Sequence, residues 1–113
     1  MRLAVLILAL ATGAAQAQAP LVLNDYPTEA RADYVFGCMA ANGQTREMLS
    51  RCSCSIDIIA SILPYDGYVA AETVLSLRQG GGERMTIFRT AEPAKGAVAD
   101  LRRAQAEAEI RCF

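Results

Sequence analysis

Two cysteines separated by a single serine, Cys52 and Cys54, lie in a stretch whose apolar residues recur with the period of an α-helix. Cys52 shares one helical face with Leu49, Ile56 and Ile59, which is the i, i+3, i+4 spacing of a buried stripe. Because a helix advances by about 100° per residue, Cys54 points roughly 200° away from Cys52. The two thiols therefore face different neighbours, and we expect this helix to be joined covalently to two other parts of the chain.

The first residues are expected to be an export signal rather than part of the fold. Met1 and Arg2 supply a positive start, residues 3–11 an apolar run, and residues 15–19 two overlapping small-x-small cleavage sites. The apolar run is shorter than the roughly 20 residues of a membrane-spanning helix. We therefore expect residues 1–19 to be a signal peptide cleaved after Ala17 or Ala19. Residues 20–113 are then a single disulfide-bonded domain of the periplasm, with no membrane span in the mature protein.

All four cysteines of the chain, Cys38, Cys52, Cys54 and Cys112, follow the predicted cleavage sites. An even number in a small exported protein predicts a framework of two disulfides. The first two predicted helices form a hairpin around residues 42–43, and along it Cys52 lies about 3 Å closer to the level of Cys38 than Cys54 does. Since a disulfide requires Cα atoms within about 7 Å, this favours Cys38–Cys52 with Cys54–Cys112. The crossed arrangement, Cys38–Cys54 with Cys52–Cys112, is the alternative.

Helical periodicity, with turn and stop signals, predicts an all-α domain of four or five helices held together by the two disulfides. The predicted helices are residues 29–41, 45–63, 68–79, 83–89 and 93–111. Thr28 and Asp66 are expected to cap the first and third helices through their side chains. Thr90 or Glu92 is expected to cap the last. The wide apolar arc of the second helix predicts neighbours on more than one of its sides.

Charge and histidine content restrict the chemistry that this chain can perform. It has 11 basic and 12 acidic residues, and the basic residues are dispersed along the sequence. Binding to a phosphate backbone requires clustered positive charge, so nucleic-acid binding is not expected. Histidine is absent, which removes the commonest general base near neutral pH and the commonest metal ligand. Glu107 and Glu109 are two residues apart on a helix and do not converge, and Asp57 is on the solvent side. We therefore expect neither enzymatic activity nor a bound cofactor.

The Cys52-Ser53-Cys54 sequence also permits two active roles. Closely spaced thiols can exchange disulfides or bind Cu(I) as soft ligands. Either role requires free thiols, whereas each cysteine here has a separate candidate partner, so structural disulfides are favoured. Met39, Met48 and Met85 lie on apolar faces and are expected to fill gaps in the core rather than to bind copper.

A turn containing two tyrosines is the best sequence candidate for a contact with another protein. Tyr65, Asp66 and Tyr68 follow directly after Pro64. Exposed tyrosines at a rigid turn suit a partner contact, because each ring offers a large apolar surface with a polar edge. The alternative is that both rings pack against the end of the helical hairpin.

Several segments together resemble an uncharacterised family of small exported four-cysteine helical proteins of proteobacteria. These segments are residues 34–39, 51–57, 63–65, 82–84 and 106–113, which read YVFGCM, RCSCSID, LPY, GER and AEAEIRCF. The resemblance covers nearly all of the mature chain. Members are often encoded near PQQ-dependent alcohol dehydrogenases and their c-type cytochromes. The resemblance therefore implies an accessory role in periplasmic alcohol or methanol oxidation with a protein partner, and it implies no catalytic or ligand-binding residue.

Three hypotheses about function follow from these observations. The first is a non-catalytic periplasmic accessory or binding protein that supports a PQQ-dependent alcohol or methanol dehydrogenase. The second is a thiol-redox or copper-handling protein that uses free thiols of Cys52 and Cys54. The third is a small periplasmic stress chaperone, which would loosen and bind clients at acid pH.

Overall fold

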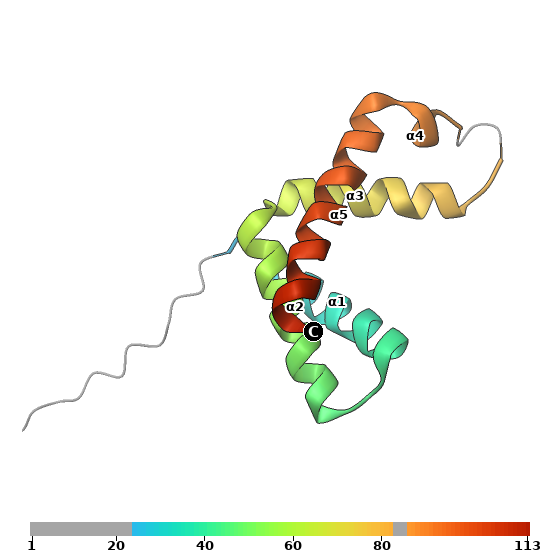
Figure 1. Cartoon of the computed structure of the whole chain (residues 1–113). Coiled ribbons are helices and arrows are strands. Elements are labelled where there is room, and N and C mark those ends of the chain that lie inside the picture. Colours follow the sequence, from blue (N-terminus) through green and yellow to red (C-terminus); the bar gives the residue numbers. More distant parts are fainter. Residues whose placement is uncertain (1–23, 83–85) are drawn as a thin grey trace, which may run out of the picture.

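The computed structural model describes residues 24–82 and 86–113, and within these residues the chain forms five helices and no strand (Figure 1). The helices are α1 (Thr28–Asn42), α2 (Arg46–Ile62), α3 (Tyr65–Gln79), α4 (Thr86–Thr90) and α5 (Glu92–Cys112). The predicted all-α fold is confirmed. The predicted signal peptide, residues 1–19, and residues 83–85 of the predicted fourth helix lie outside the described residues.

The beginnings of α1 and α3 differ from the prediction. Each helix follows a proline, Pro27 or Pro64, which occupies the N-cap position with φ of −59° and −58° and offers no side-chain cap. Thr28 and Asp66 are therefore inside the first turns, and their prediction as N-caps was wrong. The backbone N–H of Tyr65 instead donates to the carboxylate of Asp25 at 3.1 Å, so a residue 40 positions away satisfies one of the unpaired donors of α3.

The cap predicted for the last helix was also wrong, whereas α2 has a side-chain cap. Ala91 occupies the N-cap of α5 without a side-chain hydrogen bond. Thr90 belongs to α4, where its hydroxyl donates to the carbonyl of Thr86 at 3.0 Å. At the start of α2, the Oγ1 of Thr45 accepts a hydrogen bond from the N–H of Met48 at 3.1 Å.

α5 and α2 together organise the fold: α5 contacts α2, α3 and α4, and α2 contacts α1 and α5 (Figure 1). α1 and α2 form a hairpin that turns at Gly43, whose φ of 121° is unfavourable for other residues. α5 runs from the short α4, crosses α3 and ends beside α2 (Figure 1). The second helix thus has neighbours on two sides, α1 and α5, as its wide apolar arc predicts. Leu49 and Ile62, at the margins of that arc, remain 41% and 47% exposed.

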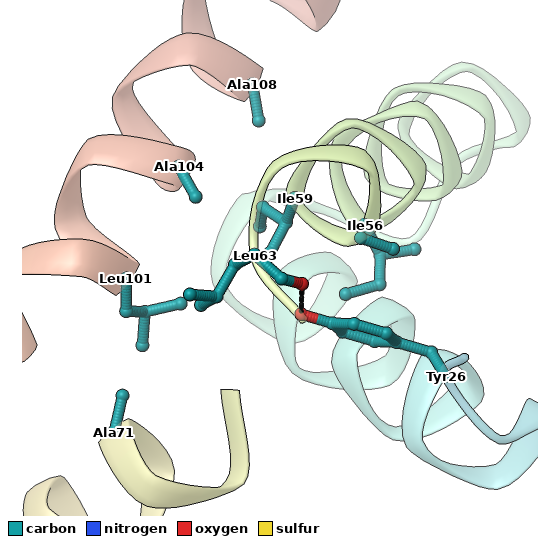
Figure 2. Packing of buried hydrophobic residues seen from close by; sticks show 9 residues of the cluster. Tyr26, Ile56, Ile59, Leu63, Ala71, Leu101, Ala104 and Ala108 are labelled. Carbon is teal, nitrogen blue, oxygen red and sulfur yellow. Dashed lines mark hydrogen bonds between the residues drawn. The ribbon is translucent and has the colours of Figure 1, made fainter. Parts of the chain in front are cut away.

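The core lies where α2, α3 and α5 meet (Figure 2). Ile56 and Ile59 of α2 and Leu101 of α5 are its largest fully buried apolar side chains. The α5 residues Ala104 and Ala108 are also fully buried, and such small side chains allow neighbouring helices to approach closely. The remaining buried members of this cluster are Tyr26, Ala60, Leu63 and Ala71.

Tyr26 fastens the segment before α1 to the end of α2. Its ring is buried, and its hydroxyl donates to the carbonyl of Leu63 at 2.8 Å (Figure 2). This bond satisfies a carbonyl that the end of a helix leaves without an intrahelical partner. The N-terminal end of α1 is therefore anchored in the core, although α1 itself contains no fully buried residue.

Among the described residues, no single helix is long and apolar enough to cross a membrane. α2 and α3 taken together have sufficient length and composition, but they are bent by 112° where they meet.

Candidate functional site

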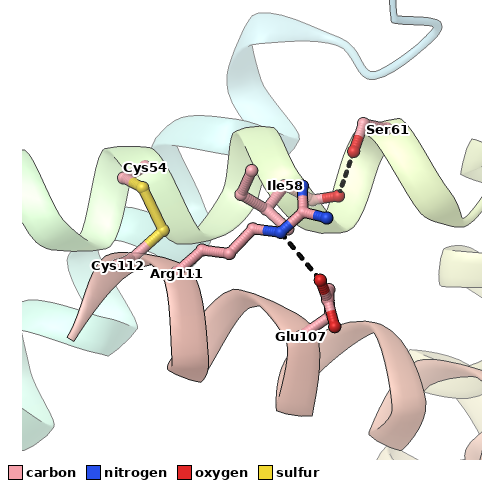
Figure 3. A network of polar contacts seen from close by, with 6 residues as sticks. All are labelled: Cys54, Ile58, Ser61, Glu107, Arg111 and Cys112. Atoms are coloured by element: carbon pink, nitrogen blue, oxygen red, sulfur yellow. Dashed lines mark hydrogen bonds and ion pairs between the residues drawn. A yellow bond between two sulfur atoms is a disulfide. The ribbon is translucent and has the colours of Figure 1, made fainter.

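Both predicted disulfides are present. Cys38 of α1 is bonded to Cys52 of α2, and Cys54 of α2 is bonded to Cys112 of α5, with Cα atoms 5.9 and 5.8 Å apart. Figure 3 shows the second disulfide beside the ion pair between Arg111 and Glu107 of α5. Cys52 and Cys54 therefore join α2 to two different helices, as their angular separation predicts.

The disulfides occupy every sulfur atom that the second hypothesis requires. None of the four cysteines is free, and Cys52 is fully buried. In the described part of the chain, no group of three or more histidine, cysteine, aspartate or glutamate residues is placed to hold a metal ion. Copper binding or thiol exchange at Cys52 and Cys54 would thus require prior reduction of two disulfides.

The tyrosines of the predicted partner surface pack against one another and against the core. The ring centroids of Tyr65 and Tyr68 lie 5.1 and 5.2 Å from that of Tyr26, and both rings are half-buried. Asp66 is exposed, and its carboxylate accepts a hydrogen bond from the N–H of Gly67 at 2.8 Å. This is the arrangement of the alternative interpretation, in which the rings close the end of the hairpin. A partner contact at Tyr65, Asp66 and Tyr68 stays a prediction.

Burial raises the pKa values of two of these tyrosines, Tyr68 and Tyr26. Desolvation, followed by the nearby charge of Glu72, raises the pKa of Tyr68 to about 12. Burial likewise raises the pKa of Tyr26 far above its ordinary value. Tyr26 and Tyr68 therefore keep neutral hydroxyl groups, and they are unsuited to act as bases near neutral pH.

A cleft of about 440 Å³ lies between α1, α3 and α5, with α2 as its floor, and we call it the acidic cleft. Three carboxylates line it, one from each wall: Asp33, Glu72 and Glu109. Three aromatic rings also line it: Tyr34, Tyr68 and Phe113. Of the described residues that line the cleft, none is a lysine or an arginine. The combination of negative charge with aromatic faces is suited to a cationic group, which both features attract.

The floor and one wall of the acidic cleft are tied together by a hydrogen bond. The hydroxyls of Tyr34 on α1 and Ser55 on α2 lie 2.8 Å apart, and Ser55 is only 4% exposed. On the same wall, a Cβ atom added at Gly37 would meet nothing within 4 Å, so the cleft is open there. The Arg51 guanidinium, which is not part of the cleft lining, lies 6.0 Å from the centre of the Phe113 ring.

Among the described residues, none forms an ion pair with a carboxylate of the acidic cleft. None of the ion pairs within residues 24–82 and 86–113 includes Asp33, Glu72 or Glu109. Desolvation and the neighbouring Asp33 carboxylate raise the pKa of Glu72, while Arg102 acts in the opposite direction. An incoming cation would relieve the repulsion between these two carboxylates, so the charge of the cleft favours cation binding.

Replacing Glu72 with glutamine is expected to stabilise the protein at about pH 7 and to reduce its gain in stability on acidification. The pKa of Glu72 is raised in the folded state, so folding favours the protonated form. The contribution of this group to stability therefore rises as pH falls through the folded pKa, and it is lost as pH rises above it. The measurement is the Tm of wild type and Glu72→Gln between about pH 4 and pH 7.

Glu29→Gln, in the first turn of α1 and outside the acidic cleft, is the matched control and should retain the gain on acidification. Identical pH profiles for Glu72→Gln and wild type would contradict the effect of burial. The third hypothesis, an acid-activated chaperone, predicts loosening at low pH, whereas the contribution of Glu72 to stability increases as pH falls.

The spacing of polar and aromatic residues in the sequence contains a signal for the acidic cleft that the sequence predictions did not use. Tyr68 and Glu72 on α3, and Gln105 and Glu109 on α5, are each four residues apart and so share a helix face. Of the predicted site residues, Cys38 and Tyr68 line the cleft, and Tyr65 and Asp66 do not. Glu107 and Glu109 do not converge, as predicted, since Glu107 pairs with Arg111 at 2.7 Å.

A second hollow lies on the other side of α1, between α1 and α2, and we call it the α1–α2 groove. It has a volume of about 440 Å³ and is lined mainly by apolar side chains, which include Val35, Phe36, Met39, Leu49 and Ile56. Met39 thus lines a surface groove rather than the core interior, while Met85 lies outside the described residues. Phe36, which no predicted apolar face included, is 76% exposed.

Comparison of the chain with protein-family models, with curated proteins and with solved structures finds no match.

Proposed function

We propose that this protein is a non-catalytic binding protein of the periplasm, and that its acidic cleft receives a cationic group of a partner protein. The observation that carries the proposal is the composition of the cleft, which has three carboxylates, three aromatic rings and no basic lining residue. Lysine and arginine side chains are attracted both by carboxylates and by aromatic faces. Two disulfides hold α1 and α5, which form two of the walls, to the same helix. A rigid site loses little conformational entropy on binding.

The partner that we propose belongs to a PQQ-dependent alcohol or methanol dehydrogenase system. The resemblance described above supports this form of the proposal, and so does the charge of the acidic cleft. PQQ carries three carboxylates, so the cleft would repel the free cofactor. A basic segment of the dehydrogenase, or of its electron acceptor, is attracted instead. The protein is therefore proposed to act on the proteins of the system rather than as a carrier of PQQ.

The test is affinity purification of the tagged, exported protein from cells of its source grown on methanol or ethanol. We expect the dehydrogenase or its cytochrome in the eluate, identified by mass spectrometry and by PQQ-dependent activity. The variant Asp33→Asn with Glu109→Gln should weaken binding to the identified partner about tenfold, and raised salt should weaken wild-type binding. Intact mass after alkylation under denaturing conditions establishes that both disulfides are present in the material used.

The matched control is Glu29→Gln with Asp66→Asn, which removes the same number of charges outside the acidic cleft. It should bind the partner as wild type does. Loss of binding in the control alone would indicate that the interface is the turn with Tyr65 and Tyr68. This outcome would contradict the role of the cleft. Wild-type protein that captures no oxidoreductase from these cells would contradict the accessory function itself.

A further inference from the structure

The outer side of α1 exposes apolar side chains of the kind that pack at an interface between molecules. The helix has 15 residues and none of them is fully buried. Its N-terminal end is anchored through Tyr26, and Cys38 joins it to α2. Phe36, which lines the α1–α2 groove on the α1 side, is 76% exposed, and Leu49 on the α2 side is 41% exposed. Exposed large apolar side chains grouped around a groove mark a surface at which another molecule packs.

The α1–α2 groove has the size and lining to accept an aromatic side chain. Ile56, which is only 2% exposed, lies at its base, and Val35 and Met39 contribute to the α1 side. An apolar protein cavity of about 150 Å³ is already large enough for benzene. The volume of about 440 Å³ therefore accommodates a phenylalanine ring. The ring and the groove that fits it belong to the same face of the same molecule.

The polar groups of this face are also complementary to themselves. Arg31 of α1 and Asp57 of α2 line the groove, and their charged atoms are 3.9 Å apart. This distance is longer than that of a charge-assisted hydrogen bond. Within the described part of the chain, the buried Nε of Arg31 has no hydrogen-bond acceptor. The groove lining thus contains one cation and one anion, and their side chains are 36% and 47% exposed, so both can reach a second copy.

We propose that two copies of this chain form a two-fold symmetric dimer through the α1–α2 groove, with Phe36 of each copy inserted into the groove of the other. A two-fold interface brings the same patch of both subunits together, so a residue and the site that receives it must lie on one face. Phe36 and the groove meet this requirement. Arg31 and Asp57 meet it for charge, because each copy offers the guanidinium of the other a second carboxylate.

The proposal goes beyond the binding function proposed above, because the groove and the acidic cleft share no lining residue. α1 stands between them, so the dimer leaves the cleft of each copy open. A dimer would present two acidic clefts, and a partner with two basic segments would bind it with a gain from multivalency.

The experiment is sedimentation velocity of the mature, oxidised protein over a range of concentrations, with Phe36→Asp as the test and Ile110→Asp as the matched control. Phe36 on α1 and Ile110 on α5 are 76% and 80% exposed, so both variants place the same charge at a solvent-facing apolar position. We expect a concentration-dependent dimer for wild type and Ile110→Asp. For Phe36→Asp we expect a Kd at least about 100-fold higher, the effect of losing a central aromatic anchor.

A second variant separates loss of the ring from the effect of a new charge. Phe36→Ala should raise the Kd about tenfold or more, with the helical circular dichroism and Tm of the monomer unchanged. Asp33→Asn with Glu109→Gln should dimerise as wild type does, so a failure of the dimer is distinguishable from a failure of the acidic cleft. A wild-type monomer at every concentration, or a dimer insensitive to Phe36→Asp, would overturn the proposal. Capture of an identified different protein by monomers through Phe36 would overturn it as well.

Discussion

Removing the disulfide between α2 and α5, by Cys54→Ala with Cys112→Ala, is expected to lower the free energy of unfolding by about 4 kcal/mol. The two residues are 58 positions apart, and a cross-link over a long loop removes much conformational entropy from the unfolded chain. Domains of this size are stable by only about 5–15 kcal/mol, so this loss removes between about a quarter and four fifths of the total stability. The measurement is equilibrium urea unfolding followed by circular dichroism.

The variant lacking the other disulfide, Cys38→Ala with Cys52→Ala, provides the comparison. Its loop spans 14 positions, which corresponds to about 3 kcal/mol on the same chain-entropy relation. Loss of the fully buried Cys52 sulfur adds a packing cost. A loss of less than about 1 kcal/mol in the Cys54–Cys112 variant would mean that residual structure already constrains the unfolded chain.

Leu101→Ala is expected to destabilise the protein by about 2–5 kcal/mol. Leu101 is fully buried where α5 crosses the core, and its neighbours in the cluster include Leu63 and Ala71 (Figure 2). Several of the surrounding residues are alanines, which have no further side-chain atoms to move into the space that the leucine leaves. The cavity therefore persists, and its cost adds to the lost transfer free energy.

Ile110→Ala, on the same helix, is the matched control for this substitution. Ile110 is 80% exposed, and its truncation should change the free energy of unfolding by no more than about 0.5 kcal/mol. The pair is compared by urea unfolding at one pH. Equal effects of the two substitutions would show that the crossing of α5 over α2 and α3 is not the stabilising core.

The sequence predicted the helices and the disulfide pairing because both depend on regular geometry. Helical rise and rotation determine the level and direction of Cys38, Cys52 and Cys54 once the hairpin is recognised. The helix caps could not be predicted in the same way. The donor at Tyr65 is satisfied by Asp25, which is 40 residues distant, and no local rule relates the two.

The acidic cleft depends on how far α1 lies from α3 and α5, which periodicity does not specify. Asp33, Glu72 and Glu109 each appear in the sequence as ordinary polar residues of a solvent-facing helix side. Only the packing of both α1 and α5 on α2 brings them to one hollow. The exposure of Phe36 was not predicted for a related reason. Tyr34, Val35 and Cys38 already form the inner face of α1, so the Phe36 ring has no packing role in the monomer.

The positions of the two disulfides give the chain a short covalent path through its interior. This path enters at Cys38 and crosses the first disulfide to Cys52. It continues through Ser53 to Cys54 and leaves across the second disulfide at Cys112. The two loops closed by these bonds lie outside that path, so a pulling force on the ends of the chain is not transmitted along them. A protease cut at Gly81 or Gly82 would likewise fall within the longer loop. The two fragments would remain joined, and the nick would be invisible until the protein was reduced.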